Sequence, residues 1–209
     1  TLIYDLITRI RNLFFELGFL KQTSFNIPII VVGNLSFGGT GKTPQIEYLI
    51  RLLKGGFKTA VLSRGYKRKT KGFVLLNGTH SAEDVGDEPL QYFKKFKDID
   101  VAVDANRVEG ILKLITNTSP NLVLLDDAFQ HRKVKGSFYI LLTKYDDLFT
   151  DDFLLPTGNL RESGAGAKRA DIILVTKCPI DLSETSKNKI RDKFKKFKTS
   201  VFFTKISYA

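Results

Sequence analysis

A glycine-rich segment, GNLSFGGTGKT at residues 33–43, lies between an apolar run at 27–32 and a helix-like run at 43–54. The order of strand, glycine loop and helix is typical of a P-loop, in which backbone N–H groups and the helix N-terminus bind phosphates. In this motif the lysine reaches the β- and γ-phosphates and the following threonine hydroxyl binds Mg²⁺. We therefore expect a nucleotide to bind at Gly38, Gly39, Thr40, Gly41, Lys42 and Thr43.

One position of the loop departs from the usual G-x-x-x-x-G-K-[ST] pattern. The first glycine of that pattern should fall at residue 36, which is Ser36, and Gly38 and Gly39 supply the flexibility instead. A glycine turn between a strand and a helix is the alternative interpretation. The loop indicates a nucleoside triphosphate, but by itself it does not identify the reaction.

Apolar runs alternate with helical patterns along the rest of the chain. We expect strands at 27–32, 58–63, 72–76, 100–103, 121–125, 137–142, 171–176 and 200–206, and helices at 43–54, 89–97, 106–116 and 182–197. Continuous apolar strands that alternate with helices predict an α/β fold, with a mostly parallel sheet covered by helices on both faces. We expect residues 25–209 to form one lobe of the P-loop NTPase type.

Residues 1–24 form a separate N-terminal element by pattern. Leucine and isoleucine recur every three or four residues over 1–21, which predicts an amphipathic helix. Charged residues such as Asp5 and Arg9 interrupt the run, so this helix should not cross a bilayer. It would either lie in a membrane interface with its apolar face down or pack on its own domain.

The charge balance favours anionic partners. The 209 residues carry 33 Lys and Arg against 22 Asp and Glu, a net charge of +11. Nucleotides, nucleic acids and acidic membranes all suit such a surface. No nucleic-acid-binding module accompanies the charge, so we expect no nucleic acid partner. The basic loop at 67–69 would face anionic lipid, whereas the bases at 187–198 would line a solvated helix face. The single cysteine, Cys178, cannot form an internal disulfide, which fits a reducing compartment.

Several polar residues follow the predicted strands, where the P-loop also opens. Asp126 and Asp127 end the apolar strand at 121–125, as in a Walker B strand, so we expect them near the Mg²⁺ of Thr43. Capping of a turn is the alternative for this pair. Arg107 follows the strand at 100–103 and would stabilise charge on a phosphoryl group. Asp87 opens a helix, either as a cap or as the base that accepts a proton from an attacking hydroxyl.

These segments together resemble a known family. The residues involved are VGNLSFGGTGKTP at 32–44, LSRGY at 62–66, GDEP at 86–89, DDAFQH at 126–131, LRE at 160–162 and RAD at 169–171. In this order they resemble the tetraacyldisaccharide 4'-kinases, the lipid A 4'-kinases. The resemblance implies a monomeric kinase that uses ATP and Mg²⁺ to phosphorylate the 4'-hydroxyl of a tetraacyl glucosamine disaccharide 1-phosphate, a late step of lipid A biosynthesis. It also implies attachment of the enzyme to the cytoplasmic face of the bacterial inner membrane through an N-terminal helix.

The resemblance also assigns roles to single residues. It makes Asp87 the catalytic base and Arg107 and Lys42 further catalytic residues, and it makes Thr43, Asp126 and Asp127 the metal ligands. It adds four further active-site candidates with less defined roles, which are Arg64, His131, Arg161 and Glu162.

The chain departs from the family in one respect. The family has a C-terminal lobe with a histidine that pairs with the base aspartate, whereas the histidines here are His80 and His131. There is also no methionine. We therefore expect the chain to be the N-terminal lobe of a longer protein.

A P-loop switch or partitioning ATPase that acts through protein partners is the alternative function. Those proteins carry an additional lysine before the double glycine, where this chain has Phe37. A guanine-specific switch would carry Asn-Lys-x-Asp, and the nearest match, TKCP at 176–179, lacks the aspartate.

Overall fold

The computed structural model describes residues 2–206, which divide between two compact units. Of these described residues, the first unit comprises 2–21, 33–42 and 138–206, and the second comprises 22–32 and 43–137. Strand β1 (Ile29–Asn34) and helix α2 (Lys42–Leu53) each contribute residues to both units. The glycine-rich loop between them therefore follows the strand and precedes the helix, as the sequence predicts.

The second unit is built on strands β1, β2 (Thr59–Ser63), β3 (Val74–Leu75), β4 (Asp100–Val103) and β5 (Leu122–Leu125). They lie in the order β3-β4-β2-β5-β1. The pairs β1–β5, β2–β5 and β2–β4 are parallel, and only the short strand β3 pairs antiparallel with its neighbour β4. Every residue of β2 and β5 is buried, which explains why these strands are uniformly apolar or small in the sequence.

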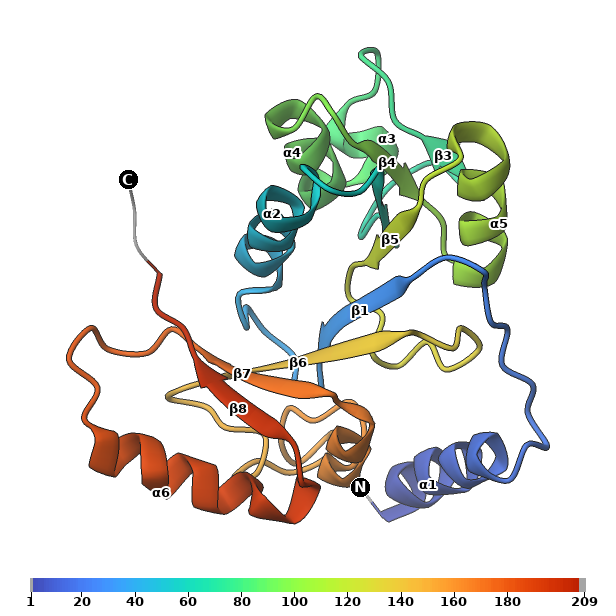
Figure 1. Ribbon diagram of the computed structural model, residues 1–209. Helices are drawn as coiled ribbons and strands as arrows, with labels where there is room; N and C mark the ends of the chain where they lie inside the picture. The colour runs from blue at the N-terminus through green and yellow to red at the C-terminus, as the bar shows by residue number, and fades with distance from the viewer. Residues whose placement is uncertain (1, 207–209) are drawn as a thin grey trace. The chain divides into compact units, whose positions relative to one another are not determined.

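Helices cover both faces of these strands. The helices of this unit are α2, α3 (Ala82–Val85), α4 (Asp87–Lys95) and α5 (Arg107–Thr118). Figure 1 shows α5 on one side of β4 and β5, and α2 and α4 on the other side. This arrangement confirms the prediction of an α/β fold with a mostly parallel sheet and helices on both faces.

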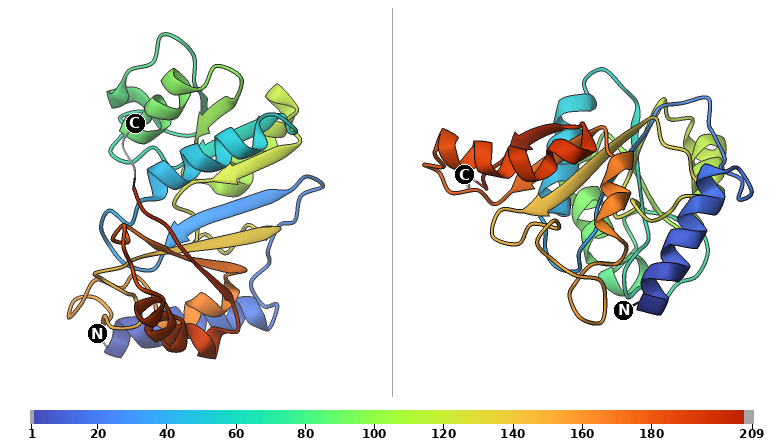
Figure 2. Two further views of the ribbon diagram at one scale, coloured as in Figure 1. Left: turned by 60° about the vertical axis from the view of Figure 1, so that its left-hand side comes forward. Right: turned by 90° about the horizontal axis from the view of Figure 1, so that it is seen from below.

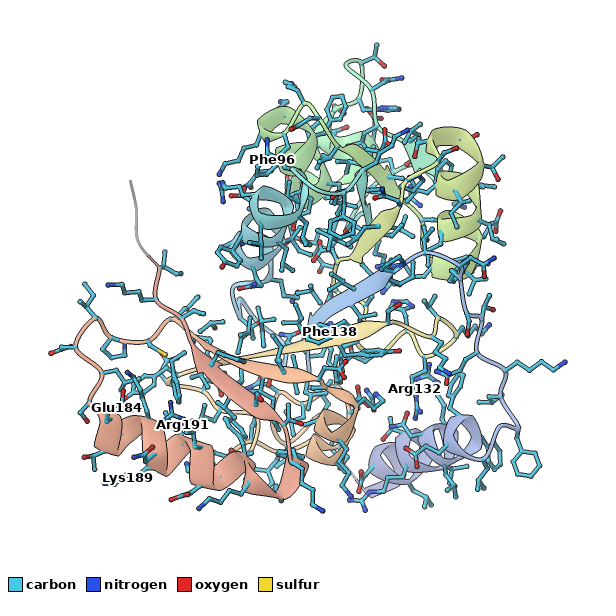
Figure 3. All side chains as sticks on the ribbon, viewed as in Figure 1. Phe96, Arg132, Phe138, Glu184, Lys189 and Arg191 are labelled. Carbon is cyan, nitrogen blue, oxygen red and sulfur yellow. The ribbon has the colours of Figure 1, made fainter. Side chains whose placement is uncertain are left out.

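Polar and aromatic contacts join α2 to α4. The Glu47 carboxylate of α2 is buried and accepts hydrogen bonds from Gln91 Nε2 at 2.8 Å and Lys95 Nζ at 2.6 Å. The guanidinium of Arg51 lies 5.3 Å from the ring centroid of Phe96, the residue that follows α4 (Figure 3). The mutual orientation of the two helices is therefore set by specific contacts as well as by apolar packing.

The first unit contains helix α1 (Leu2–Glu16), strands β6 (Phe138–Lys144), β7 (Ile172–Thr176) and β8 (Ser200–Phe203), helix α6 (Glu184–Phe194) and the 3₁₀ helices η1 (Gly164–Arg169) and η2 (Lys195–Phe197). Strands β6, β7 and β8 pair in parallel in that order. Helix α6 runs alongside β8 (Figures 1 and 2). The ring of Phe194, the last residue of α6, stacks on the ring of Phe149 with centroids 5.2 Å apart. Glu184 and Lys189 are exposed on α6, as expected for a solvated face, whereas the Arg191 guanidinium lies 5.2 Å from the ring centroid of Phe203 on β8 (Figure 3).

The element boundaries differ from the predicted ones at several places. Helix α1 ends at Glu16 rather than at residue 21, because Gly18 adopts φ +80° and turns the chain out of the helix. The expected first helical residue, Thr1, and residues 207–209 of the expected lobe lie outside the described residues. Helices α3 and η1 were not expected. No helix over residues 2–206 is long and apolar enough to span a membrane.

Candidate active site

The glycine loop of the first unit depends on two glycine conformations. Gly38 and Gly41 have φ values of +109° and +83°, which side-chain-bearing residues rarely adopt. A Cβ atom at Gly38 would meet no atom within 4 Å, and one at Gly41 would come no closer than 3.7 Å to Thr176. The loop therefore requires these glycines for their backbone conformation and not for lack of space.

Lys42 is the first residue of α2, and the last residue of β1 contacts its side chain. Lys42 Nζ donates a hydrogen bond to Asn34 Oδ1 at 3.3 Å, and Asn34 Nδ2 donates to the Ser36 carbonyl at 2.7 Å. The Asn34 side chain is completely buried. Asn34 thus links the lysine to the start of the loop, so the ammonium group lies at the loop that would receive the phosphates.

A second segment of the first unit pairs with this loop. The Phe37 N–H donates to the Asn159 carbonyl at 2.8 Å, and the Arg161 N–H donates to the Leu35 carbonyl at 2.7 Å. The Arg161 guanidinium lies 4.5 Å from the ring centroid of Phe37, which is a cation–π distance. Arg161, a candidate from the family resemblance alone, therefore lies directly beside the glycine loop.

Glu162 has a different environment from Arg161. Its carboxylate is 4 % exposed and accepts hydrogen bonds from Arg169 Nη2 at 2.8 Å and from Asn12 Nδ2 of α1 at 3.3 Å. These partners hold the loop before η1 against α1. The contacts of Glu162 in the first unit are those of a buried ion pair that orders the segment behind Arg161.

The end of β7 also contacts the glycine loop. Thr176 Oγ1 donates to the Thr40 carbonyl at 2.8 Å, and Lys177 follows with a left-handed φ of +57°. The Lys177 ammonium lies 3.8 Å from the position that a Cβ atom at Gly39 would occupy. The TKCP segment, which lacks the aspartate of a guanine-specific switch, nevertheless packs directly on the phosphate-loop backbone.

In the second unit, five polar side chains gather near the start of α2. Thr43 Oγ1 donates to Glu88 Oε1 at 2.9 Å. The Asp126 carboxylate, 1 % exposed at the end of β5, accepts hydrogen bonds at Oδ2 from Tyr92 Oη and from Ser63 Oγ, each at 3.3 Å. The Tyr92 hydroxyl also contacts the Thr43 side chain. Residues of α2, α4 and β2, together with Asp126 after β5, thus form one polar group.

The Tyr92 hydroxyl keeps its proton in this group. Tyr92 is fully buried, and burial together with the negative charges of Asp126 and Glu88 raises the pKa of Tyr92 above its usual range. The hydroxyl therefore always has a proton to donate in a hydrogen bond. The Asp126 carboxylate, which can only accept, accepts this hydrogen bond.

Arg107 supports the chain at the end of β5. Its side chain is 2 % exposed, and its guanidinium donates to the carbonyls of Asp104 and, at 3.2 Å, of Asp126. Burial lowers the pKa of Arg107 to about 10, although the charges of Asp126 and Asp127 act in the opposite direction. Arg107 remains a cation at neutral pH, and its hydrogen bonds go to backbone carbonyls.

The two carboxylates after β5 have different environments. Asp126 is buried, whereas Asp127 is half-buried and has a left-handed φ of +48°. Such a conformation is uncommon for a non-glycine residue and is found preferentially at functional sites. His131 is half-buried in the turn that follows, where its backbone N–H donates to the Ala128 carbonyl at 2.9 Å.

Asp87 is exposed at the first residue of α4, and the N-cap position falls on Gly86. Gly86 has φ +93°, and a Cβ atom there would lie 3.2 Å from both Gly65 Cα and the Tyr66 carbonyl oxygen. The turn before Asp87 therefore packs backbone against backbone on the loop that carries the exposed Arg64.

A hollow of about 440 Å³ lies beside Asp87. It is lined by Asp87, Leu90, Gln91, Lys94 and Lys95, all on α4. The hollow is mixed in character, because it contains an aliphatic side chain, two cationic side chains and one exposed carboxylate. The Lys95 ammonium is already paired with Glu47, so the other charges at this hollow are those of Lys94 and Asp87.

The oxygen donors of the second unit fit a magnesium ion. Mg²⁺ is usually bound by one or two carboxylates together with water and substrate phosphates. Within residues 2–206 there is no group of three or more His, Cys, Asp and Glu side chains that would hold a metal without other ligands. The Thr43 hydroxyl and the Asp126 carboxylate share one polar group and are hard oxygen donors, so they suit this ion.

Three residues of these groups were not among those predicted from the sequence, namely Asn34, Glu88 and Tyr92. Glu88 lies inside the GDEP segment and was considered only as part of a helix start. Tyr92 follows Glu88 by four residues, so both side chains lie on one face of α4. That spacing is the one signal in the sequence that relates Tyr92 to the carboxylates.

Comparison with known proteins extends over nearly the whole chain. A family model described as tetraacyldisaccharide-1-P 4'-kinase matches residues 1–206. A protein of Flavobacterium johnsoniae named tetraacyldisaccharide 4'-kinase is 61% identical over 209 residues, which cover 99% of this chain and 62% of that protein. A protein of Bacteroides fragilis with the same name is 52% identical over 202 residues, which cover 95% of this chain and 54% of that protein. This chain therefore spans less than two thirds of the length of these relatives.

A solved structure is also similar. It is a crystal structure of LpxK from Aquifex aeolicus, described as the "apo" form in complex with ATP. The two chains superpose with a TM-score of 0.78 at 33% sequence identity, and the match covers 98% of this chain and 78% of the other.

Proposed function

The chain belongs to the tetraacyldisaccharide-1-P 4'-kinase family, and we propose that it transfers the γ-phosphoryl group of ATP to the 4'-hydroxyl of a tetraacyl glucosamine disaccharide 1-phosphate. This reaction belongs to lipid A biosynthesis. The observation that carries the proposal is the family match over residues 1–206, which includes the glycine loop and every candidate residue. The ATP bound to the Aquifex aeolicus relative supports ATP as the phosphoryl donor.

We assign the donor nucleotide to the glycine loop. The backbone of Gly38, Gly39, Thr40 and Gly41 would bind the phosphates, and Lys42 would compensate the charge of the β- and γ-phosphates. Thr43 and Asp126, with Asp127 beside them, would hold Mg²⁺. The metal supplies neutralisation of the charge that develops on the phosphates. Arg107 would add a fixed positive charge and hold the backbone at Asp126.

We assign the acceptor to Asp87. The carboxylate is exposed beside a hollow whose lining combines Leu90 with Lys94, and this mixture suits an anionic glycolipid. Phosphoryl transfer requires positioning more than base strength, because the transition state is loose. Asp87 would accept the proton of the 4'-hydroxyl, and the rigid packing of Gly86 on Gly65 would keep it in place.

The remaining candidates have supporting roles in this proposal. Arg161 lies over Phe37 at the loop and would contact phosphate oxygens, while Glu162 orders the segment that carries it. Arg64 is exposed directly after β2, and His131 is half-buried in the turn after β5. Each of the two would contribute a contact to the phosphates or to the acceptor.

A transfer assay tests this function. The protein expressed from its complete gene should transfer phosphate from ATP to a tetraacyldisaccharide 1-phosphate. Because Lys42 would neutralise charge that grows in the transition state, Lys42→Ala should lower kcat by ~10²–10³. The matched control is Lys54→Ala. Lys54 directly follows the C-terminal end of α2, so this variant should retain full activity. Full activity of Lys42→Ala in a folded protein would refute the assignment of the loop, and replacement of ATP by GTP tests the preference for adenine.

We also propose that α1 docks on the membrane that holds the substrate, at the cytoplasmic face of the inner membrane. Several apolar side chains of α1 are exposed: Leu6 is 58%, Ile7 59% and Phe14 44% exposed, although Phe15 on the same helix is buried. An amphipathic helix of this kind binds in the interface through its apolar face. The net charge of +11 would add attraction to anionic lipid.

Co-sedimentation with vesicles that contain anionic lipid tests this proposal. The double substitution of Ile7 and Phe14 by Glu should reduce binding, because it places two carboxylates on the face that would enter the interface. The control is the same change at Tyr48 and Leu52, two exposed residues of α2. If both double variants bind like the unsubstituted protein, the membrane contact does not involve α1.

A further inference from the structure

Tyr92 contacts two of the residues to which we assign the metal. Its side chain is fully buried, its hydroxyl lies 3.3 Å from Asp126 Oδ2, and it also contacts the Thr43 side chain. Thr43 is the second residue of α2, Asp126 follows β5, and Tyr92 lies in the middle of α4. This hydroxyl group therefore donates to one proposed ligand, Asp126, and lies against the other, Thr43.

The direction of each hydrogen bond supports a role in orientation. Thr43 has one hydroxyl proton and donates it to Glu88. The Tyr92 proton goes to Asp126, because a carboxylate only accepts. A threonine whose proton is already donated to a carboxylate presents oxygen lone pairs to any other neighbour. Ser63 donates to the same Oδ2 atom of Asp126 as Tyr92, so two donors fix the rotation of this carboxylate.

A tyrosine in this position has a cost that a phenylalanine would avoid. A buried hydroxyl destabilises the fold unless it is hydrogen-bonded, whereas a phenyl ring fills almost the same volume without a polar group. The partners of the Tyr92 hydroxyl are the side chains of Thr43 and Asp126 rather than backbone groups. Its hydroxyl therefore orients the Asp126 carboxylate through this hydrogen bond.

We propose that Tyr92 is a positioning residue that holds the Asp126 carboxylate, next to the Thr43 hydroxyl, in the arrangement that binds Mg²⁺. The proposal rests on the function proposed above. Mg²⁺ demands nearly ideal octahedral geometry, so it is sensitive to a small rotation of a ligand. Mutation of a side chain that orients a metal ligand typically lowers metal affinity by about 10–100-fold.

The test measures Mg²⁺-dependent nucleotide binding in Tyr92→Phe. A fluorescent ATP analogue is titrated with Mg²⁺ in the protein expressed from its complete gene, and the thermal midpoint is recorded without metal. We expect the Mg²⁺ midpoint to rise ~10–100-fold, while binding of the metal-free nucleotide is unchanged. The control is Tyr48→Phe, an exposed tyrosine on α2, which should titrate like the unsubstituted protein.

The outcomes separate this inference from the proposed function. If the unsubstituted protein binds the ATP analogue without dependence on Mg²⁺, the proposed metal assignment fails. If that protein depends on Mg²⁺ but Tyr92→Phe has the same Mg²⁺ midpoint and only a lower thermal midpoint, Tyr92 is an ordinary core residue. Ser63→Ala removes the other donor to Asp126 without affecting Thr43, so its Mg²⁺ midpoint should rise less than that of Tyr92→Phe. An equal or larger rise for Ser63→Ala would contradict the role of Tyr92 as the link.

Discussion

Substitution of Gly86 by alanine should damage both the stability of the protein and the position of Asp87. Gly86 has φ +93° and ψ 156°, a region that is essentially restricted to glycine. The added Cβ atom would lie 3.2 Å from Gly65 Cα and from the Tyr66 carbonyl oxygen. Both neighbours are backbone atoms, so no side chain can rotate away to make room.

The magnitude follows from these two effects. The strained backbone conformation costs ~1–3 kcal/mol, and the close contact with backbone costs a further ~1–3 kcal/mol by the general cost of overpacking. Reduced freedom of the unfolded chain offsets ~0.4–1 kcal/mol of this cost. We expect a net loss of about 3 kcal/mol in the free energy of unfolding, which corresponds to a decrease of roughly 6–12 °C in Tm for a chain of this size.

The assay is thermal and chemical denaturation of Gly86→Ala, with Gly78→Ala as the matched control. A Cβ atom at Gly78 would meet nothing within 4 Å, and its φ is not in the left-handed region. Gly78→Ala should therefore leave Tm unchanged or slightly raised. Under conditions in which Gly86→Ala is still folded, its kcat should also fall, because Asp87 is the next residue. Equal stability of the two variants would refute the close packing of Gly86 on the loop at 65–66.

Two further predictions concern carboxylates of the second unit. Asp87→Ala should lower kcat by ~10²–10⁴ with little change in nucleotide affinity, and a loss confined to Tm would contradict its role as the base. For Glu47, burial alone would raise the pKa, but hydrogen bonds from Lys95 and Gln91 and nearby positive charges lower the pKa overall. Its ionised form therefore stabilises the fold above the pKa of the unfolded chain, and this contribution is lost as pH falls from that pKa through the lower pKa of the folded state. Glu47→Gln should be less stable at pH 7, and its free energy of unfolding should decline less over that range; identical pH profiles in urea denaturation would contradict this account.

The sequence predicted the fold because each strand is short, apolar and bounded by polar residues. Strand β4 has the predicted ends, and β2, β5, β6 and β7 are within two residues of the prediction. Helix α3 was missed because it has only four residues, although Ser81 and Asp84 form a capping box at its start. Helix η1 was missed because two glycines suggested an irregular loop. Short elements depend on a few local hydrogen bonds that hydrophobic periodicity does not reveal.

The candidate site was predictable where residues follow a motif and unpredictable where they meet across the fold. Thr43 and Asp126 belong to recognisable patterns. Tyr92 is separated from Asp126 by 34 positions and has no motif of its own, and Thr43 and Glu88 are separated by 45. Contacts of this kind depend on the packing of α4, which no local pattern specifies. Arg107 was expected to act on phosphate, but its hydrogen bonds to backbone carbonyls could be seen only in the structure.

The hydrogen bonds between the glycine loop and residues 159–161 couple the motions of the two segments. The Phe37 amide donates to residue 159 and the Arg161 amide donates back to Leu35, so the two segments form a short antiparallel ladder. A displacement of Arg161 must either break one of these bonds or move Leu35 with it. Their amide protons should therefore exchange with solvent at similar rates, as one cooperative opening unit. By linkage, a ligand that binds Arg161 and a ligand that binds the loop must each change the affinity for the other by the same factor.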